Sequence, residues 1–158
     1  MLQKHRTIIA DTSCFIILTN IDELELLHKL YGTIITTTDI AIEFGEILPS
    51  WIEIYQVKDF QKQQLLEMQI DKGESSALAL AIELPNSTVI LDDYKARKIA
   101  EYLHINYTGT IGVIIKAKLS GLIPSIKPIL EKIKKTDFRI SNEVEFQALQ
   151  QANELQNN

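Results

Sequence analysis

The sequence has almost none of the residues that form cross-links or soft metal sites. Its 158 residues include one cysteine, Cys14, which excludes an internal disulfide bond and a zinc site made of cysteines. Cys14 lies in the apolar run of residues 14–18, and we interpret it as a buried structural thiol. The three histidines, His5, His28 and His104, are not spaced as metal ligands are.

Long hydrophobic runs are also missing. No window approaches about 18 uninterrupted apolar residues, so we expect no membrane-spanning helix. A basic cluster at residues 4–6 precedes two isoleucines, but Asp11 interrupts this apolar run too early for a signal peptide. We therefore expect a cytoplasmic protein.

Repeats, low-complexity segments and internal linkers are absent as well. Hydrophobic residues make up 46% of the chain, which is enough for one packed core at this length. We expect a single domain over residues 1–149 and a polar, fraying tail over residues 150–158.

The net charge of −5 argues weakly against nucleic-acid binding, but the charges are unevenly distributed. Residues 1–93 carry 6 Lys and Arg against 15 Asp and Glu, whereas residues 94–139 carry 10 against 3. A phosphodiester substrate could use both halves, if the acids hold a metal ion and the bases hold phosphates. Ordinary solvated helix faces explain the individual lysines equally simply.

Short apolar segments alternate with helical patterns along the chain. Strands are expected at residues 7–10, 33–36, 51–57, 88–91 and 105–107, with a further extended piece at 138–140. Helices are expected at residues 22–31, 38–48, 60–70, 73–83, 94–103, 109–121 and 124–135, followed by a last helix capped by Ser141 or Asn142. This order predicts an α/β fold with a parallel sheet, in which ligands bind at the carboxyl ends of the strands.

Acidic residues follow two of the expected strands directly. Asp11 follows the first strand, and the pair Asp92 and Asp93 follows the strand at residues 88–91. If these strands are neighbours, the three carboxylates meet at one edge of the sheet. Glu43, on the helix after the second strand, and Glu74, at the start of a later helix, can reach the same cleft.

Converging carboxylates repel one another unless a cation lies between them. Oxygen ligands without histidine or cysteine suit Mg²⁺ or Mn²⁺. A metal ion of this kind can activate water and stabilise charge on a phosphoryl oxygen. The set of acids therefore favours phosphodiester hydrolysis.

Each acid also has a purely structural interpretation. Asp11 could cap the turn that follows it, and Glu43 could simply face solvent. Glu74 is favoured near a helix N-terminus by the helix dipole, and one of Asp92 and Asp93 could cap the next helix. The functional interpretation depends on the whole set and its placement at strand ends.

The set and its spacing resemble the PIN-domain family, most closely its DUF3368 branch of nucleic-acid-binding proteins. The resemblance covers nearly the whole chain. It is carried by Ile9-Ala10-Asp11-Thr12-Ser13, Ile40 to Glu43, Gly73-Glu74-Ser75-Ser76-Ala77, Ile90-Leu91-Asp92-Asp93 with Ala96-Arg97, Thr108-Gly109-Thr110-Ile111-Gly112, and Gly121-Leu122-Ile123-Pro124. It implies a three-layer α/β/α sandwich with a central parallel sheet of four or five strands.

The resemblance also implies a set of metal ligands for Mg²⁺ or Mn²⁺. Asp11, Glu43 and Glu74 match the first three acids of the family. The fourth falls at the aspartate pair, where Asp93 is favoured over Asp92.

Further roles follow from the same resemblance. Thr12, Ser13 and Thr110 fall beside the cleft, and the basic residues Lys95, Arg97 and Lys116 could contact RNA. The resemblance implies a metal-dependent endoribonuclease, the toxin of a toxin–antitoxin pair that a small antitoxin protein blocks, and a homodimer. Two departures stand out: Cys14 occupies a position that is often proline, and Glu74 one that is often aspartate.

Other folds with clustered acids fit less well. A haloacid-dehalogenase-type phosphatase needs a second aspartate where this chain has Ser13, and a response-regulator receiver has its acid pair after the first strand. The glycine pattern of a dinucleotide-binding domain is missing. Two alternatives stay open: a catalytically inactive PIN-like module that binds RNA or protein, and a structural oligomer.

Overall fold

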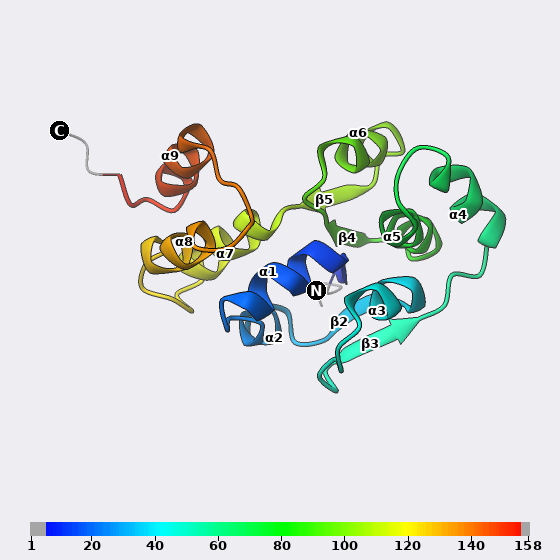
Figure 1. Cartoon of the computed structure of the whole chain (residues 1–158), viewed down its shortest axis with the longest axis horizontal. Coiled ribbons are helices and arrows are strands. Elements are labelled where there is room, and N and C mark those ends of the chain that lie inside the picture. The colour runs from blue at the N-terminus through cyan, green and yellow to red at the C-terminus, as the bar shows by residue number, and fades with distance from the viewer. Residues whose placement is uncertain (1–5, 156–158) are drawn as a thin grey trace, which may run out of the picture.

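A computed structural model describes residues 6–155 of the chain. Five parallel strands form one sheet in the order β3-β2-β1-β4-β5 (Figure 1). The strands are β1 (Thr7–Ala10), β2 (Ile34–Thr37), β3 (Ile52–Tyr55), β4 (Ser87–Ile90) and β5 (Asn106–Thr108). The helices within the described range are α1 (Thr12–Asn20), α2 (Glu25–Tyr31), α3 (Thr38–Phe44), α4 (Phe60–Glu67), α5 (Lys72–Glu83), α6 (Tyr94–Tyr102), α7 (Thr110–Leu119), α8 (Lys127–Lys134) and α9 (Asn142–Gln151). The predicted α/β/α sandwich with a parallel sheet is confirmed.

The register of the sheet brings the two acid-bearing strand ends together. Strand β1 lies at the centre and pairs with β4 along its full length, with Ala10 opposite Ile90. The backbone N–H of Asp11 continues this pairing by donating to the Ile90 carbonyl at 3.2 Å. Asp11 and the segment after β4 therefore share the carboxyl edge of the sheet, as the sequence predicts.

Helix α5 is fastened to one face of the sheet by buried hydroxyl groups. Thr37, at the end of β2, and Ser76 of α5 share a hydrogen bond of 2.6 Å, and Ser87 of β4 donates to the Ala81 carbonyl at 3.3 Å. The small residues of α5 allow this close approach, because Ala77 and Ala79 are fully buried there. This contact fixes where the amino end of α5, and hence Glu74, lies relative to the strand ends.

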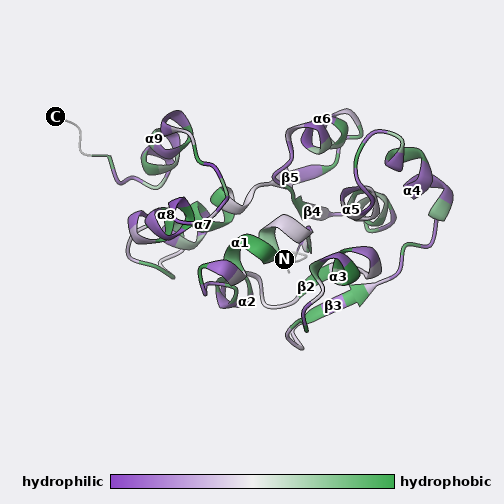
Figure 2. Cartoon of the chain, in the orientation of Figure 1, coloured by the Kyte–Doolittle hydropathy of each residue, from purple (hydrophilic) through white to green (hydrophobic). Residues whose placement is uncertain are grey.

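The carboxyl-terminal third extends beyond the edge of the sheet. Helices α7, α8 and α9 lie at one end of the molecule in Figure 1, away from β3 and α4. These three helices mix hydrophilic and hydrophobic residues, whereas α1 in the centre is coloured hydrophobic over most of its length (Figure 2). The carboxylate of Glu154 accepts hydrogen bonds from Ser125 and from the Ile126 backbone N–H, so this part is tied back onto the start of α8.

Several expected elements differ from the structure. Helix α1 was not expected, because residues 14–18 are apolar on every side and carry no helical period. Helix α3 ends before Gly45, which has φ +76°, and not near Leu48. Helix α8 begins at Lys127 and has Pro128 in its first turn, so the expected start at Pro124 was wrong.

The carboxyl-terminal part of the chain agrees with the expected elements only in part. Ser141 caps α9 by accepting from the Val144 N–H at 3.1 Å, as expected. Helix α9 continues to Gln151, so residues 150 and 151 are helical where a fraying tail was expected. Residues 138–140 form no strand, and residues 156–158 of the expected tail lie outside the described range. Within residues 6–155, no helix is long and apolar enough to cross a membrane.

Candidate metal centre at the carboxyl edge of the sheet

Asp11 occupies the centre of the acidic cluster. It follows β1 directly, precedes α1 and is only 4% exposed. Burial raises the pKa of its carboxyl group to about 8, and repulsion from Glu74, Asp71 and Glu43 adds to this shift. The backbone of Thr12 opposes the shift in pKa without cancelling it. A buried carboxyl group among three other acids is the arrangement that the sequence predicted for a cation site.

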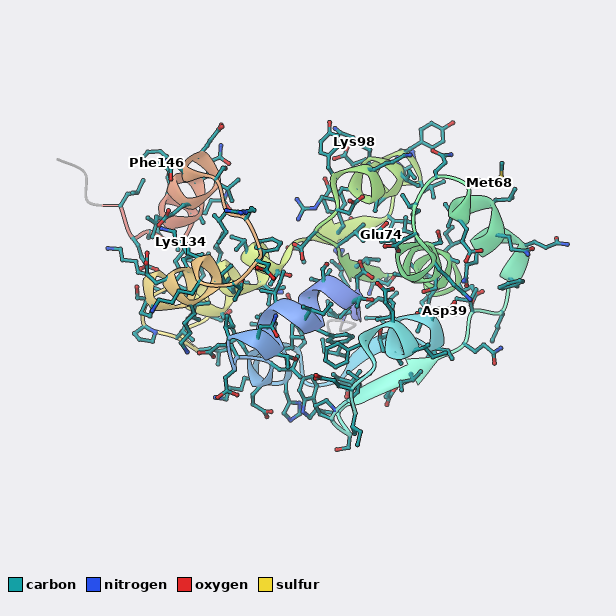
Figure 3. The ribbon with its side chains drawn as sticks, in the orientation of Figure 1. Asp39, Met68, Glu74, Lys98, Lys134 and Phe146 are labelled. Atoms are coloured by element: carbon teal, nitrogen blue, oxygen red, sulfur yellow. The ribbon has the colours of Figure 1, made fainter. Side chains whose placement is uncertain are left out.

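Glu74 belongs to the same cluster. It lies near the middle of the molecule at the amino end of α5, as Figure 3 shows. Burial raises the pKa of its carboxyl group to about 7, with further repulsion from Asp71, Asp93 and Glu43. Glu43, on α3, has its pKa raised by burial and by Asp71, and the neighbouring Thr12 side chain opposes this shift. The charges of Asp11, Glu43 and Glu74 are thus close enough to interact, and Asp93 is close enough to act on Glu74.

Asp71 is an acid of this cluster that sequence reasoning missed. It caps α5 by accepting from the Glu74 N–H at 2.8 Å, and the Glu74 side chain accepts from the Asp71 N–H at 3.3 Å. This reciprocal pair is a capping box, and its Asp-x-x-Glu signature is visible in the sequence. The structural interpretation of Glu74 is therefore correct, and it holds together with membership of the cluster.

The carboxylate of Asp92 is surrounded by hydrogen-bond donors and a cation. Its carboxylate accepts from the Thr110 N–H at 2.9 Å and from the Thr110 hydroxyl at 2.6 Å. Ser13 Oγ donates to it at 3.4 Å, and the Arg97 guanidinium lies 3.7 Å away. Asp92 thus links β4 to α1, α6 and α7. Ser13 and Thr110, expected beside the cleft, act on this residue.

Asp93 has a different environment from its neighbour. One carboxylate oxygen caps α6 by accepting from the Ala96 N–H at 2.9 Å. The residue is exposed, and it is one of the charges that raise the pKa of Glu74. Asp93 therefore adds negative charge near Glu74, while Asp92 is occupied by structural hydrogen bonds.

The backbone of Gly73 lies close to the Glu43 side chain at the edge of the cluster. A Cβ atom on Gly73 would overlap Glu43 Oε2 and would lie 3.4 Å from Thr12 Oγ1. The Thr12 hydroxyl is buried and has no hydrogen-bond partner among residues 6–155. Gly73 thus gives Glu43 room beside α5, and the Thr12 oxygen is an orphaned polar atom next to that carboxylate.

The three basic residues expected to contact RNA are not brought together. Arg97 is anchored, because its Nε donates to the Leu91 carbonyl at 2.6 Å and its guanidinium faces Asp92. Lys95 is exposed on α6. Lys116 lies on α7 with its Nζ 4.9 Å from the Tyr31 ring centroid, away from the acids. Arg97 alone stands beside the acidic edge.

The donor chemistry of the cluster fits a hard divalent cation. Carboxylates and one unpartnered hydroxyl are oxygen ligands of the type that Mg²⁺ and Mn²⁺ prefer. Across the described part of the chain, however, no three His, Cys, Asp or Glu side chains are arranged so that they could hold a metal ion as they stand. Glu74 is turned toward its capping partner, so its carboxylate would have to rotate to complete such a site.

The sequence matches one known family. A family model described as PIN domain (DUF3368) matches residues 7–154, which is almost the entire described chain. No curated protein and no solved structure matches the sequence.

Proposed function

The chain belongs to the PIN-domain family, and from this premise we propose that it is a Mg²⁺- or Mn²⁺-dependent endoribonuclease. PIN domains are nuclease-type domains that typically use divalent metal ions. One observation carries the proposal: Asp11 is almost fully buried at the carboxyl edge of the sheet, where burial raises its pKa to about 8 and repulsion from Glu74, Asp71 and Glu43 adds to the shift. A fold has no structural need for such mutual repulsion, and a cation would relieve it.

The residues of the chain have separate roles under this proposal. Asp11, Glu43, Glu74 and Asp93 would hold the metal ion, which supplies activation of water and stabilisation of charge on the scissile phosphate. Thr110 and Ser13 hold Asp92, and Asp92 orients Arg97 beside the acids. Arg97 is thereby placed where it could neutralise a phosphate of the RNA.

Cleavage of a labelled single-stranded RNA with and without Mn²⁺ tests the proposal. We expect metal-dependent cleavage by the wild type and at least a hundredfold loss in Asp11→Asn. Asp137→Asn is the matched control, because Asp137 is exposed and distant in sequence from the cluster. Equal cleavage by wild type and Asp11→Asn would contradict the assignment.

A second candidate function is a catalytically inactive PIN-like module that binds RNA or protein. It is favoured by the lack of a metal-ready arrangement among residues 6–155 and by the engagement of Glu74 in its capping box. Calorimetric titration with Mn²⁺ separates the two candidates. Saturable binding that is lost in an Asp11→Asn/Asp93→Asn variant supports the nuclease, and no binding by the wild type supports the module.

The family also suggests a biological role for the nuclease, as the toxin of a toxin–antitoxin pair whose small antitoxin covers the acidic edge. Induced expression of the wild type in a bacterial host should then arrest growth, and expression of Asp11→Asn should not. Normal growth with soluble, folded wild type would contradict the toxin role while leaving the nuclease proposal intact.

A further inference from the structure

A cavity lies apart from the acidic cluster, on the face of the sheet that α2 and α7 cover. It has a volume of about 550 Å³, which is within the range of small-molecule sites. Its polar lining consists of Arg6, Tyr31, Thr88, Thr108 and Lys116, and its apolar lining of Ile8 and Leu30. We call it the basic cavity.

The basic cavity carries positive charge with no compensating acid. Among residues 6–155, its lining contains two cations and no carboxylate, although the protein as a whole has a net charge of −5. Among residues 6–155, neither Arg6 nor Lys116 forms an ion pair. An acid-free lining excludes a divalent metal as the ligand and favours an anion.

Arg6 and Lys116 are both exposed, and each makes one contact with the cavity wall. Arg6 Nη1 donates to Thr88 Oγ1 at 3.1 Å, and Thr88 is only 9% exposed on β4. Lys116 Nζ lies 4.9 Å from the centroid of the Tyr31 ring. Neither contact uses all the donors of its cation, because a guanidinium has five N–H groups and an ammonium has three. Both side chains retain donors for a ligand.

The remaining lining indicates what the anion is attached to. A free phosphate ion would occupy a small part of about 550 Å³ and would leave Ile8, Leu30 and Tyr31 without a role. An aromatic ring and two aliphatic side chains suit a planar, weakly polar group. We propose that the basic cavity binds a free mononucleotide, with its phosphate between Arg6 and Lys116 and its base against Tyr31 and Leu30.

This site is separate from the acidic cluster. Arg6 precedes β1 and Asp11 follows it, so five residues of extended chain place them roughly 16 Å apart at opposite edges of the sheet. The inference therefore does not depend on the proposed nuclease activity. It also gives Lys116 a role, although that residue stands away from the acids.

Isothermal titration with 5′-AMP in the presence of EDTA tests the proposal on the full chain. EDTA removes divalent ions, so the acidic cluster cannot capture the phosphate through a metal. We expect saturable binding by the wild type, and at least tenfold weaker binding in Arg6→Gln/Lys116→Gln. Lys58→Gln/Lys135→Gln, which removes the same charge at exposed positions outside the cavity, should bind like the wild type.

Three comparisons make the result decisive. Asp11→Asn/Asp93→Asn should bind 5′-AMP unchanged, whereas a loss there would overturn the location in the basic cavity. Tyr31→Leu keeps both cations but removes the ring, so it should weaken binding of 5′-AMP by a larger factor than binding of inorganic phosphate. Absence of saturable binding at millimolar 5′-AMP, or equal affinity for inorganic phosphate and 5′-AMP, would overturn the assignment of a nucleotide.

Discussion

Two adjacent aspartates show how differently neighbouring residues can be used. Asp92 accepts two hydrogen bonds from Thr110, which is fully buried, and faces the Arg97 guanidinium. Asp93 makes one capping bond, and its charge helps to raise the pKa of Glu74. The sequence-based preference for Asp93 as the ligand is consistent with this division of roles, and it stays a prediction.

A matched pair of substitutions tests that division. Asp92→Asn replaces a carboxylate between donors by an amide, so we expect a loss of about 1–3 kcal/mol in the free energy of unfolding. Asp93→Asn keeps a good capping residue, and its stability should stay within about 0.5 kcal/mol of the wild type. Its Mn²⁺ affinity should fall at least tenfold. Urea unfolding and calorimetry measure the two effects, and equal loss of stability in both variants would contradict the division.

The buried carboxyl group of Asp11 makes stability depend on pH. Its pKa is about 8 in the folded protein and near 4 in the unfolded chain, so between these values only the folded state keeps the proton. The stabilisation is complete below about pH 4 and is lost as the pH rises toward 8, by at most about 1.4 kcal/mol per pH unit for one group. Glu74, with its pKa raised to about 7, acts in the same direction.

Metal-free wild type should therefore unfold more easily at pH 8 than at pH 5, as measured by urea titration in EDTA. Asp11→Asn has no titrating side chain at this position, so its free energy of unfolding should vary less over the same pH range. Asp137→Asn should follow the wild type. A wild-type stability that is constant or rises between about pH 5 and pH 8 would show that Asp11 is ionised without a metal.

At the level of elements, the acidic edge is built by strand pairing and by the placement of α5. The sequence predicted that β1 and β4 each end in aspartate at the same edge of a parallel sheet, because both are short apolar runs, but it left open whether they are neighbours, which the structure shows. Helix α1 could not, since its buried face includes Cys14, Phe15, Ile17 and Leu18 and leaves no polar stripe. The fit of Glu43 against Gly73 depends on the packing of α3 on α5, which no local pattern encodes.

The amino end of α5 offers a test that separates the site from the fold. In Gly73→Ala the new Cβ would overlap the tip of the Glu43 side chain, which is exposed and flexible and can move aside. We expect a change of less than about 1 kcal/mol in the free energy of unfolding, because alanine also favours the helix. Mn²⁺ affinity should fall, since Glu43 is displaced from the cluster. Unchanged Mn²⁺ binding would exclude Glu43 as a ligand.

Over the whole molecule, the uneven charge of the sequence is only partly a functional feature. Several lysines of the basic segment pair with acids from elsewhere in the chain: Lys132 with Glu23 at 3.0 Å, and Lys134 with Glu145. The purely structural interpretation of these lysines is therefore correct. The cations of Arg6 and Lys116 have no such partner within residues 6–155, and they line the basic cavity instead of the acidic cluster.

If the acidic cluster holds a metal ion, binding must stabilise the whole domain. A ligand that binds only the folded state adds about 2.7 kcal/mol at a hundredfold excess over its Kd. Because Asp11 and Glu74 must lose protons to bind a cation, this gain should be larger at pH 8 than at pH 6. Thermal unfolding of wild type, Asp137→Asn and Asp11→Asn/Asp93→Asn with and without Mn²⁺ measures it. A rise in Tm that is shared by the double variant would place the metal elsewhere. A rise confined to wild type and Asp137→Asn would show that a bound cation relieves the repulsion between these carboxylates.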